Sequence, residues 1–177
     1  MTMRIGLLGS MFQPYNPKGL VTGFLMASYD LTESFLHYSQ AEEIVCLYEP
    51  GQFREDQLPK FLDSFSKDDR VRLVSEYDVL FHGTSVVGNV DILHSVKEDA
   101  LPLLELREAM AKPIPITFTV HSLAEQHLML DTLLPLVLLP FKPYDAILCT
   151  SEAVRDTLSR ILARCQKVLH LSPSTVN

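Results

Sequence analysis

The chain has 177 residues, of which 47% are hydrophobic and 21% are charged, and its formal net charge is −7. That length suits one domain with a sizeable core, because roughly 100–200 residues per domain is usual. The acidic balance argues against a nucleic-acid partner or an electrostatically held membrane partner, since both favour basic patches. A small or neutral ligand fits this composition better.

The first residues and the cysteines are typical of a cytoplasmic protein. Gly6, Gly9 and Ser10 interrupt the first hydrophobic run, so it lacks the pattern of a secretory signal peptide. The three cysteines are odd in number and widely spaced, which supports neither a disulfide framework nor a zinc site. We expect all three to be buried structural thiols.

The first half of the chain predicts alternating strands and helices. A short apolar run over residues 3–8 indicates a buried strand, and apolar residues at helical spacing over 19–38, with Thr32 facing outward, indicate a helix. A second strand over 43–48 is stopped by a Pro-Gly pair. After it, the pattern predicts a short helix over 57–65, strands over 70–74 and 77–83, and a flexible loop over 83–89.

The second half continues the alternation. The longest apolar stretch, 128–141, is too short to cross a bilayer, which takes roughly 20 residues. It fits either a buried helix broken near Pro135 or a surface that docks on a second domain or, more weakly, on lipid. The pattern predicts helices over 99–111, 123–139 and 151–162, and strands over 114–120, 146–149 and 167–171.

This alternation predicts an α/β fold, with one doubly wound, mainly parallel sheet and helices on both faces. No repeat or linker interrupts it, so we expect a single Rossmann-like domain over residues 1–177. In such a sheet, ligands bind at the ends of the strands, on the carboxyl side.

Phosphate-binding motifs do not explain the first glycines. Gly6 and Gly9 superficially suggest a dinucleotide-binding turn, but mostly bulky residues separate Gly9 from the next glycine, Gly19. A phosphate cradle needs closely spaced glycines that open directly into a helix. A dehydrogenase is therefore disfavoured, and a P-loop is excluded because the chain has no Gly-Lys-Ser or Gly-Lys-Thr.

Three short motifs occur in a characteristic order along the chain. They are Pro17-Lys18-Gly19 after the first strand, Pro115 to Ser122 at the fifth, and Asp145 to Glu152 at the sixth. In this order they resemble the N-terminal domain of retaining glycosyltransferases of family 4 (group 1), which have the GT-B fold. The resemblance covers nearly the whole chain.

The resemblance implies the acceptor-binding half of a hexosyltransferase. In that family the N-terminal domain mainly binds a sugar, glycan or glycolipid acceptor, and a C-terminal domain, expected to be missing here, holds the nucleotide sugar. The chain alone is then expected to be inactive, to need no metal, and to be a natural half or an excised piece. Apolar surface that is left exposed without its partner domain is expected to favour self-association.

His121 is the expected catalytic residue. It follows a predicted central strand, where an imidazole could bind a sugar hydroxyl or favour developing negative charge, and the resemblance puts it near the reacting sugar. A purely structural histidine is the alternative. Four other histidines show no metal-ligand spacing and are expected at the surface or packed on helices: His37, His94, His127 and His170.

The expected substrate-binding residues follow the strands. Gly19 precedes a helix and, with Lys18, matches a loop that the family places near the donor phosphates, although Leu20 stands where a second glycine is usual. Ser151 and Glu152 either cap a helix or face the cleft. The other expected substrate-binding residues should contact the acceptor: His82, Gly83, Thr84 and Ser122.

A second hypothesis keeps the fold but not the catalysis. The same crevice could serve a non-catalytic α/β module that binds a small molecule or a protein. A continuation of the gene carrying two acids eight residues apart, the family's donor motif, would favour the glycosyltransferase. The sequence identifies neither the sugar nor the acceptor.

Overall fold

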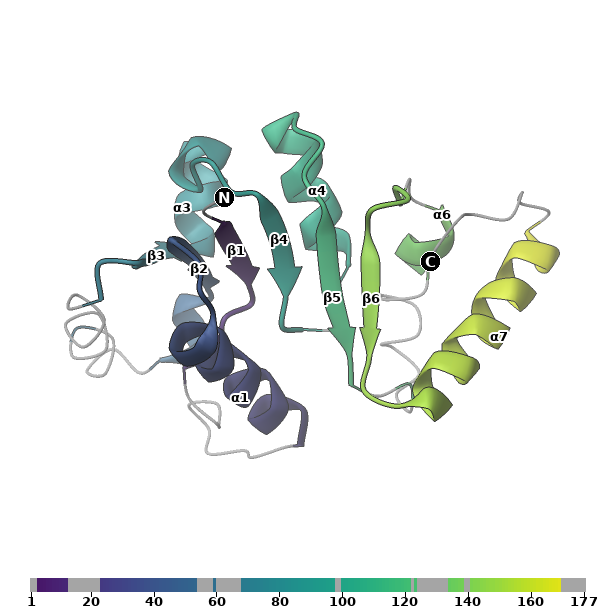
Figure 1. The fold of residues 1–177 in the computed structure, drawn as a ribbon. Helices are drawn as coiled ribbons and strands as arrows, with labels where there is room; N and C mark the ends of the chain where they lie inside the picture. The colour runs from purple at the N-terminus through teal and green to yellow at the C-terminus, as the bar shows by residue number, and fades with distance from the viewer. Residues whose placement is uncertain are drawn as a thin grey trace. The chain divides into compact units, whose positions relative to one another are not determined.

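The computed structural model describes residues 3–12, 23–53, 59, 68–97, 100–121, 123, 134–138 and 141–169. Its strands form a six-stranded sheet in the order β3-β2-β1-β4-β5-β6 (Figure 1). The pairs β1–β2, β1–β4, β2–β3 and β5–β6 are all parallel. The predicted α/β fold is therefore confirmed. The strands are β1 (Arg4–Leu8), β2 (Glu43–Tyr48), β3 (Val71–Ser75), β4 (Ile92–Ser95), β5 (Ile116–Val120) and β6 (Ala146–Cys149).

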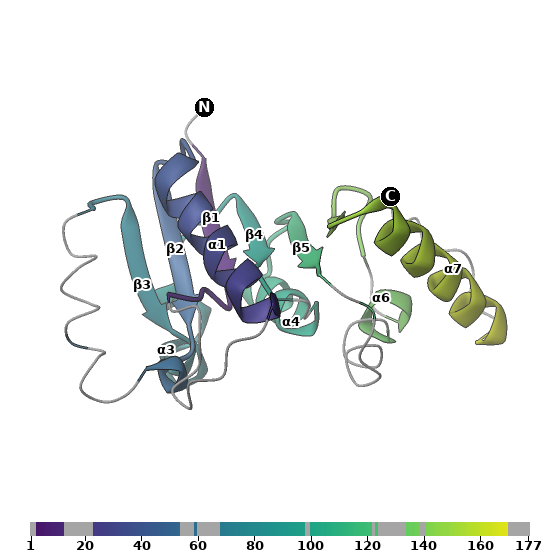
Figure 2. The same ribbon diagram turned by 90° about the horizontal axis from the view of Figure 1, so that it is seen from below.

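Helices alternate with these strands. Figure 2 shows these helices in a view onto the carboxyl ends of the strands. No helix among the described residues has both the length and the apolar character needed to cross a bilayer. The α-helices are α1 (Gly23–Tyr38), α3 (Glu76–His82), α4 (Leu101–Met110), α6 (Leu134–Leu138) and α7 (Glu152–Val168), and two short 3-10 turns are η1 (Pro50–Gln52) and η2 (Thr84–Val86).

The chain divides into two compact units, Met1–Val96 and Lys97–Asn177. In the first unit, α1 packs on one face of the sheet. Leu36 of α1 joins Ile5 and Ile44, which pair with each other across β1 and β2, in one buried cluster. The alternate residues of these strands are buried as well, so the strands are covered on both faces as a parallel sheet requires.

Gly6 occupies a tight position within β1. A Cβ atom at this position would lie 2.7 Å from Leu93 Cδ2 and 3.6 Å from Val90 Cγ1. The missing side chain therefore lets the neighbouring strand β4 and the segment before it pack closely on β1. Gly6 is therefore a packing position.

The prediction of a strand over residues 77–83 is wrong, because this segment forms α3. Ser75 starts the helix: its hydroxyl accepts a hydrogen bond from Tyr77 N at 3.1 Å, and its own N–H donates to Asp78 Oδ2 at 3.2 Å. Gly83, with φ 72°, ends it. Reciprocal capping of this kind favours a helix whatever the apolar content of the run.

The fourth strand, β4, was missed by sequence reasoning. It is only four residues long and contains His94 and Ser95, so its apolar pattern is weak. His94 is nonetheless 2% exposed, and its ring centroid lies 5.1 Å from that of Phe35 in α1. It thus packs on a helix, whereas His37 is exposed and its Nε2 lies 3.0 Å from Glu33 Oε2.

The predicted strand over 167–171 is wrong where the structure describes it. Lys167 and Val168 are the last residues of α7, and Leu169 N still donates to Cys165 O at 2.9 Å. Helical hydrogen bonding therefore continues past the predicted helix end at 162. The predicted helix over 57–65 and the first part of that over 123–139 lie outside the described residues, except for residues 59 and 123.

Candidate functional site

The loop after β1 is tied to β2 at the carboxyl end of the sheet. Ser10 is 1% exposed, its N–H donates to Leu47 O at 3.0 Å, and its hydroxyl donates to Leu7 O at 3.0 Å. Gly9, with φ 63°, makes the turn that brings Ser10 back against the strand end. Residues 9–12, the described part of this loop, are therefore held against the core.

Gln52, from the turn after β2, holds the same loop. Its Nε2 donates to Ser10 O at 3.0 Å, and its Oε1 accepts from Phe12 N at 3.2 Å. One side chain thus satisfies a donor and an acceptor of the β1 loop. Sequence reasoning missed Gln52, and nothing local to a Pro-Gly-Gln turn could have indicated the role.

Thr32 holds the loop from the helix side. It is fully buried, its Oγ1 accepts from Met11 N at 3.1 Å, and its hydroxyl donates to Ser28 O at 2.9 Å. The prediction that Thr32 faces outward is therefore wrong. A threonine hydroxyl can bond the carbonyl four residues back and still accept from a loop amide, so it can lie buried on a helix.

Replacing Thr32 with valine is expected to lower the free energy of unfolding by about 1–3 kcal/mol, because the Met11 N–H loses its acceptor inside the protein. Urea unfolding followed by circular dichroism measures the change. The matched control is Thr157→Val on the exposed face of α7, which should stay within about 0.5 kcal/mol of the parent. Equal effects of the two substitutions would show that the Thr32 bond contributes nothing.

Aromatic rings lie beneath this loop. Phe12 stacks on Phe53 with ring centroids 6.4 Å apart, and Tyr48 meets both rings edge-on at 6.5 and 6.1 Å. Burial, and next Asp78, raise the pKa of Tyr48 above its ordinary value. The three rings give the carboxyl ends of β1 and β2 an apolar base.

Of the three cysteines, all free thiols, only Cys46 is fully buried; Cys149 and Cys165 are half-buried, which corrects the expectation that all three lie in the core. Burial raises the pKa of Cys46 to about 12, although a hydrogen bond with Ser10 opposes the rise. Burial also raises the pKa of Cys149, against the opposing charge of Arg155. Cys46 therefore stays a thiol at neutral pH.

The raised pKa of Cys46 predicts a pH dependence of stability. The unfolded chain loses this proton near pH 9 and the folded protein near pH 12, so above pH 9 the unfolded state binds fewer protons and folding weakens. The contribution is full below pH 9 and is lost as the pH rises toward 12. The stability difference between the parent and a Cys46→Ala variant should therefore shrink with pH over this window in urea titrations. A constant difference would contradict the prediction.

In the second unit, the ends of β5 and β6 are joined by Thr150. Its N–H and its hydroxyl donate to Val120 O at 3.4 and 3.3 Å, and its hydroxyl also approaches His121 O at 3.4 Å. His121 follows β5 directly and is partly exposed. His121 and Thr150, which follow the two strands, are thereby brought together.

Ser151 and Glu152 begin α7. Ser151 is the N-cap, with its Oγ accepting from Val154 N at 3.2 Å, and Glu152 is an exposed acid in the first turn. The helix-cap alternative is thus confirmed for Ser151. Capping occupies an acceptor site of the hydroxyl and leaves its proton for another partner.

His82 and Gly83 do not end a strand as predicted, and Thr84 does not follow one. His82 ends α3, and Thr84 begins η2, whose carbonyl at Val86 accepts from Arg72. Arg72 is near the start of β3 and also donates to Glu43 Oε1, at the start of β2, at 2.8 Å. Because Arg72 joins η2 to the beginning of β2, Thr84 lies toward the edge of the sheet opposite the crevice in which it was predicted.

The remaining predicted residues, Lys18, Gly19 and Ser122, lie outside the described part of the chain. Within the described part, no three His, Cys, Asp or Glu side chains gather in a way that could hold a metal ion. The described site therefore consists of the polar residues after β5 and β6.

A buried ion pair that sequence reasoning missed supports these two strands from their other ends. Arg107 Nη1 of α4 donates to both carboxylate oxygens of Asp145, at 2.8 and 2.7 Å, and the two side chains are 8% and 1% exposed. Asp145 also accepts from Ile116 N at 2.9 Å and Lys142 N at 2.8 Å. One carboxylate thus joins α4 to the beginnings of β5 and β6.

Comparison with known proteins does not assign this chain to a family. No family model, no curated protein and no solved structure matches this chain.

Proposed function

We propose that this chain is the acceptor-binding part of a hexosyltransferase that resembles the family 4 retaining enzymes. The observation that carries the proposal is the polar cluster of His121, Thr150 and Ser151 at the carboxyl ends of β5 and β6 in a parallel α/β sheet. Parallel sheets of this kind bind ligands at that edge. The order of the three sequence motifs supports the same assignment.

The proposal requires this cluster only to bind and orient the acceptor. His121 would bind a sugar hydroxyl and help to hold the reacting groups in line, and the Ser151 hydroxyl would donate to the acceptor. Glu152, exposed at the start of α7, would accept from a further hydroxyl. The nucleotide sugar would be held mainly by a second domain, so no metal or nucleotide site is required of this part.

The first test is a calorimetric titration of the 177-residue protein with uridine and guanosine diphosphate sugars. We expect no saturable heat, because the proposal assigns the donor to another domain. Tight binding of a nucleotide sugar would overturn the assignment and favour a self-standing α/β module that binds small molecules.

The second test concerns the acceptor. Saturation-transfer NMR with common mono- and disaccharides is expected to detect weak binding, and His121→Ala should weaken it by about tenfold, as loss of one to two hydrogen bonds predicts. The control is His37→Ala, an exposed histidine of α1 whose ring bonds Glu33. Equal weakening by both variants, or no weakening by His121→Ala, would contradict the role given to His121.

A further inference from the structure

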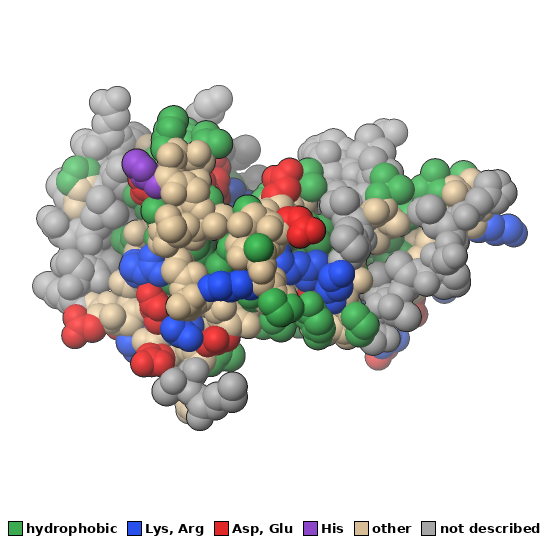
Figure 3. All heavy atoms as spheres, turned by 90° about the horizontal axis from the view of Figure 1, so that it is seen from above, with side chains coloured by type: hydrophobic (Ala, Val, Ile, Leu, Met, Phe, Trp, Pro, Cys, Tyr) green, Lys and Arg blue, Asp and Glu red, His purple; other side chains and the backbone are tan. Residues whose placement is uncertain are grey.

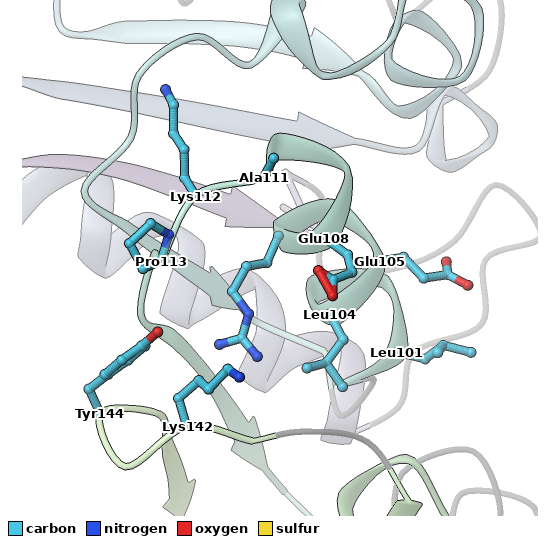
Figure 4. Close-up of a pocket in the computed structure, with 10 residues that line it drawn as sticks. Leu101, Leu104, Glu105, Glu108, Ala111, Lys112, Pro113, Lys142 and Tyr144 are labelled. Carbon is cyan, nitrogen blue, oxygen red and sulfur yellow. The ribbon is translucent and has the colours of Figure 1, made fainter.

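A pocket of about 760 Å³ lies in the second unit where β5 and β6 begin, at the opposite ends of these strands from His121 and Thr150. Helix α4 forms one wall, and the segments before β5 and β6 form the other (Figure 4). Its volume is within the range of roughly 300–1,000 Å³ usual for small-molecule sites. Nothing in the proposed sugar site uses it.

The walls of this pocket are held in place before any ligand arrives. Arg107, one of the lining residues, is bonded to Asp145, which also accepts from the backbone at Ile116 and Lys142. The ion pair therefore fixes α4 against both of the other lining segments. A preformed site loses less conformational entropy on binding, so weak individual contacts count for more.

Opposite charges face each other across the pocket. In Figure 4 the Lys142 side chain extends toward α4, and the Glu108 carboxylate lies beside Leu104 on that helix. Among the described residues, neither the Lys142 ammonium nor the Glu108 carboxylate has an ion-pair or hydrogen-bond partner. On the face where the strands begin, acidic and basic side chains lie close together (Figure 3).

The surface between these charges is apolar. Leu104 is buried, Leu101 and Tyr144 are 39% and 46% exposed, and Pro113 completes the wall opposite α4. A leucine and a tyrosine ring that stay this exposed in a concave site gain from being covered. The pocket thus has an apolar centre with Lys142 on one side and Glu108 on the other. Three further charged residues line it: Glu105, Lys112 and Arg107, whose charge is paired with Asp145.

We propose that this pocket binds a small zwitterion with an apolar body, of the size of an apolar dipeptide. The ligand carboxylate would meet Lys142, and its ammonium would meet Glu108, near the carboxyl end of α4 where helix carbonyls also favour a cation. The side chains would cover Leu104 and Tyr144. An anion without an ammonium would face Glu108 unpaired, and a cation without a carboxylate would leave Lys142 unpaired, which is why both charges are required.

The test is NMR titration of the 177-residue protein with leucyl-leucine, its N-acetyl derivative and its C-terminal amide. We expect saturable shifts at Leu101, Leu104 and Tyr144, with each blocked derivative about two- to fivefold weaker, as is usual for partly exposed charge pairs. Glu108→Gln should weaken the free dipeptide by this factor but leave the N-acetyl derivative unchanged. Lys142→Gln should weaken the dipeptide and leave the amide unchanged.

Matched controls separate the effect of the Lys142 and Glu108 charges from that of a change in the protein's overall charge. Glu42→Gln changes an exposed carboxylate that does not line the pocket, and Lys167→Gln changes an exposed lysine at the end of α7. Both should leave dipeptide affinity unchanged. The proposal is overturned if leucyl-leucine causes no saturable shift at the pocket, or if both blocked derivatives bind as well as the free dipeptide.

Discussion

Replacement of Asp145 with alanine is expected to lower the free energy of unfolding by about 3–5 kcal/mol, the usual cost of removing one partner from a buried ion pair. The substitution leaves the Arg107 guanidinium, 8% exposed, without its carboxylate. It also removes the acceptor of the Ile116 and Lys142 amides. Urea unfolding followed by circular dichroism measures the loss.

An exposed ion pair provides the control for this prediction. Arg155 Nη2 lies 3.2 Å from Asp156 Oδ1, with side chains 62% and 54% exposed, and Asp156→Ala should cost less than about 1 kcal/mol. The double variant Arg107→Met with Asp145→Leu should recover part of the loss, since it leaves no buried charge unpaired. A cost for Asp145→Ala no greater than that for Asp156→Ala would contradict the structural role of the buried pair.

The second large effect is expected at the centre of β5. Phe118 is fully buried, and its ring centroid lies 6.4 Å from that of Phe141. Phe118→Ala removes this ring and leaves a cavity that the rigid strand cannot close, so we expect a loss of about 3–5 kcal/mol. The midpoint of urea unfolding should fall with little change in its slope.

The same substitution at an exposed phenylalanine separates cavity formation from loss of apolar content. Phe81 on α3 is 76% exposed, so Phe81→Ala should stay within about 0.5 kcal/mol of the parent. If both variants lose the same stability, the ring of Phe118 is not a core group. The comparison is direct because both changes remove the same atoms.

The success of strand prediction followed the strength of the apolar pattern. β1, β2, β5 and β6 are mostly apolar segments bounded by loop residues, although β5 contains Thr117 and Thr119, and their bounds agree with prediction to within two residues. β4 was missed because His94 and Ser95 break its run, and α3 was misassigned because its apolar run resembles a strand. The capping signal at Ser75 and Asp78 was present in the sequence and outweighs that run.

The candidate site was predictable only in part. His121 and Ser151 follow strands, so a parallel sheet brings them to one edge without further information. The predicted position of Thr84 depended on whether residues 77–83 form a strand or a helix. Once the helix returns the chain toward the beginning of the sheet, Thr84 leaves the predicted crevice.

The sequence by itself determined the alternation of buried strands and helices, because the period and length of apolar runs are local properties of the chain. Only the tertiary structure decided which polar groups hold the strand ends. The bonds of Met11 to Thr32, Gln52 to Ser10 and Arg107 to Asp145 join residues 21, 42 and 38 positions apart. A polar group that burial removes from water needs a hydrogen-bond partner. That partner is whichever group the folded chain brings within hydrogen-bonding distance. No local sequence pattern specifies it.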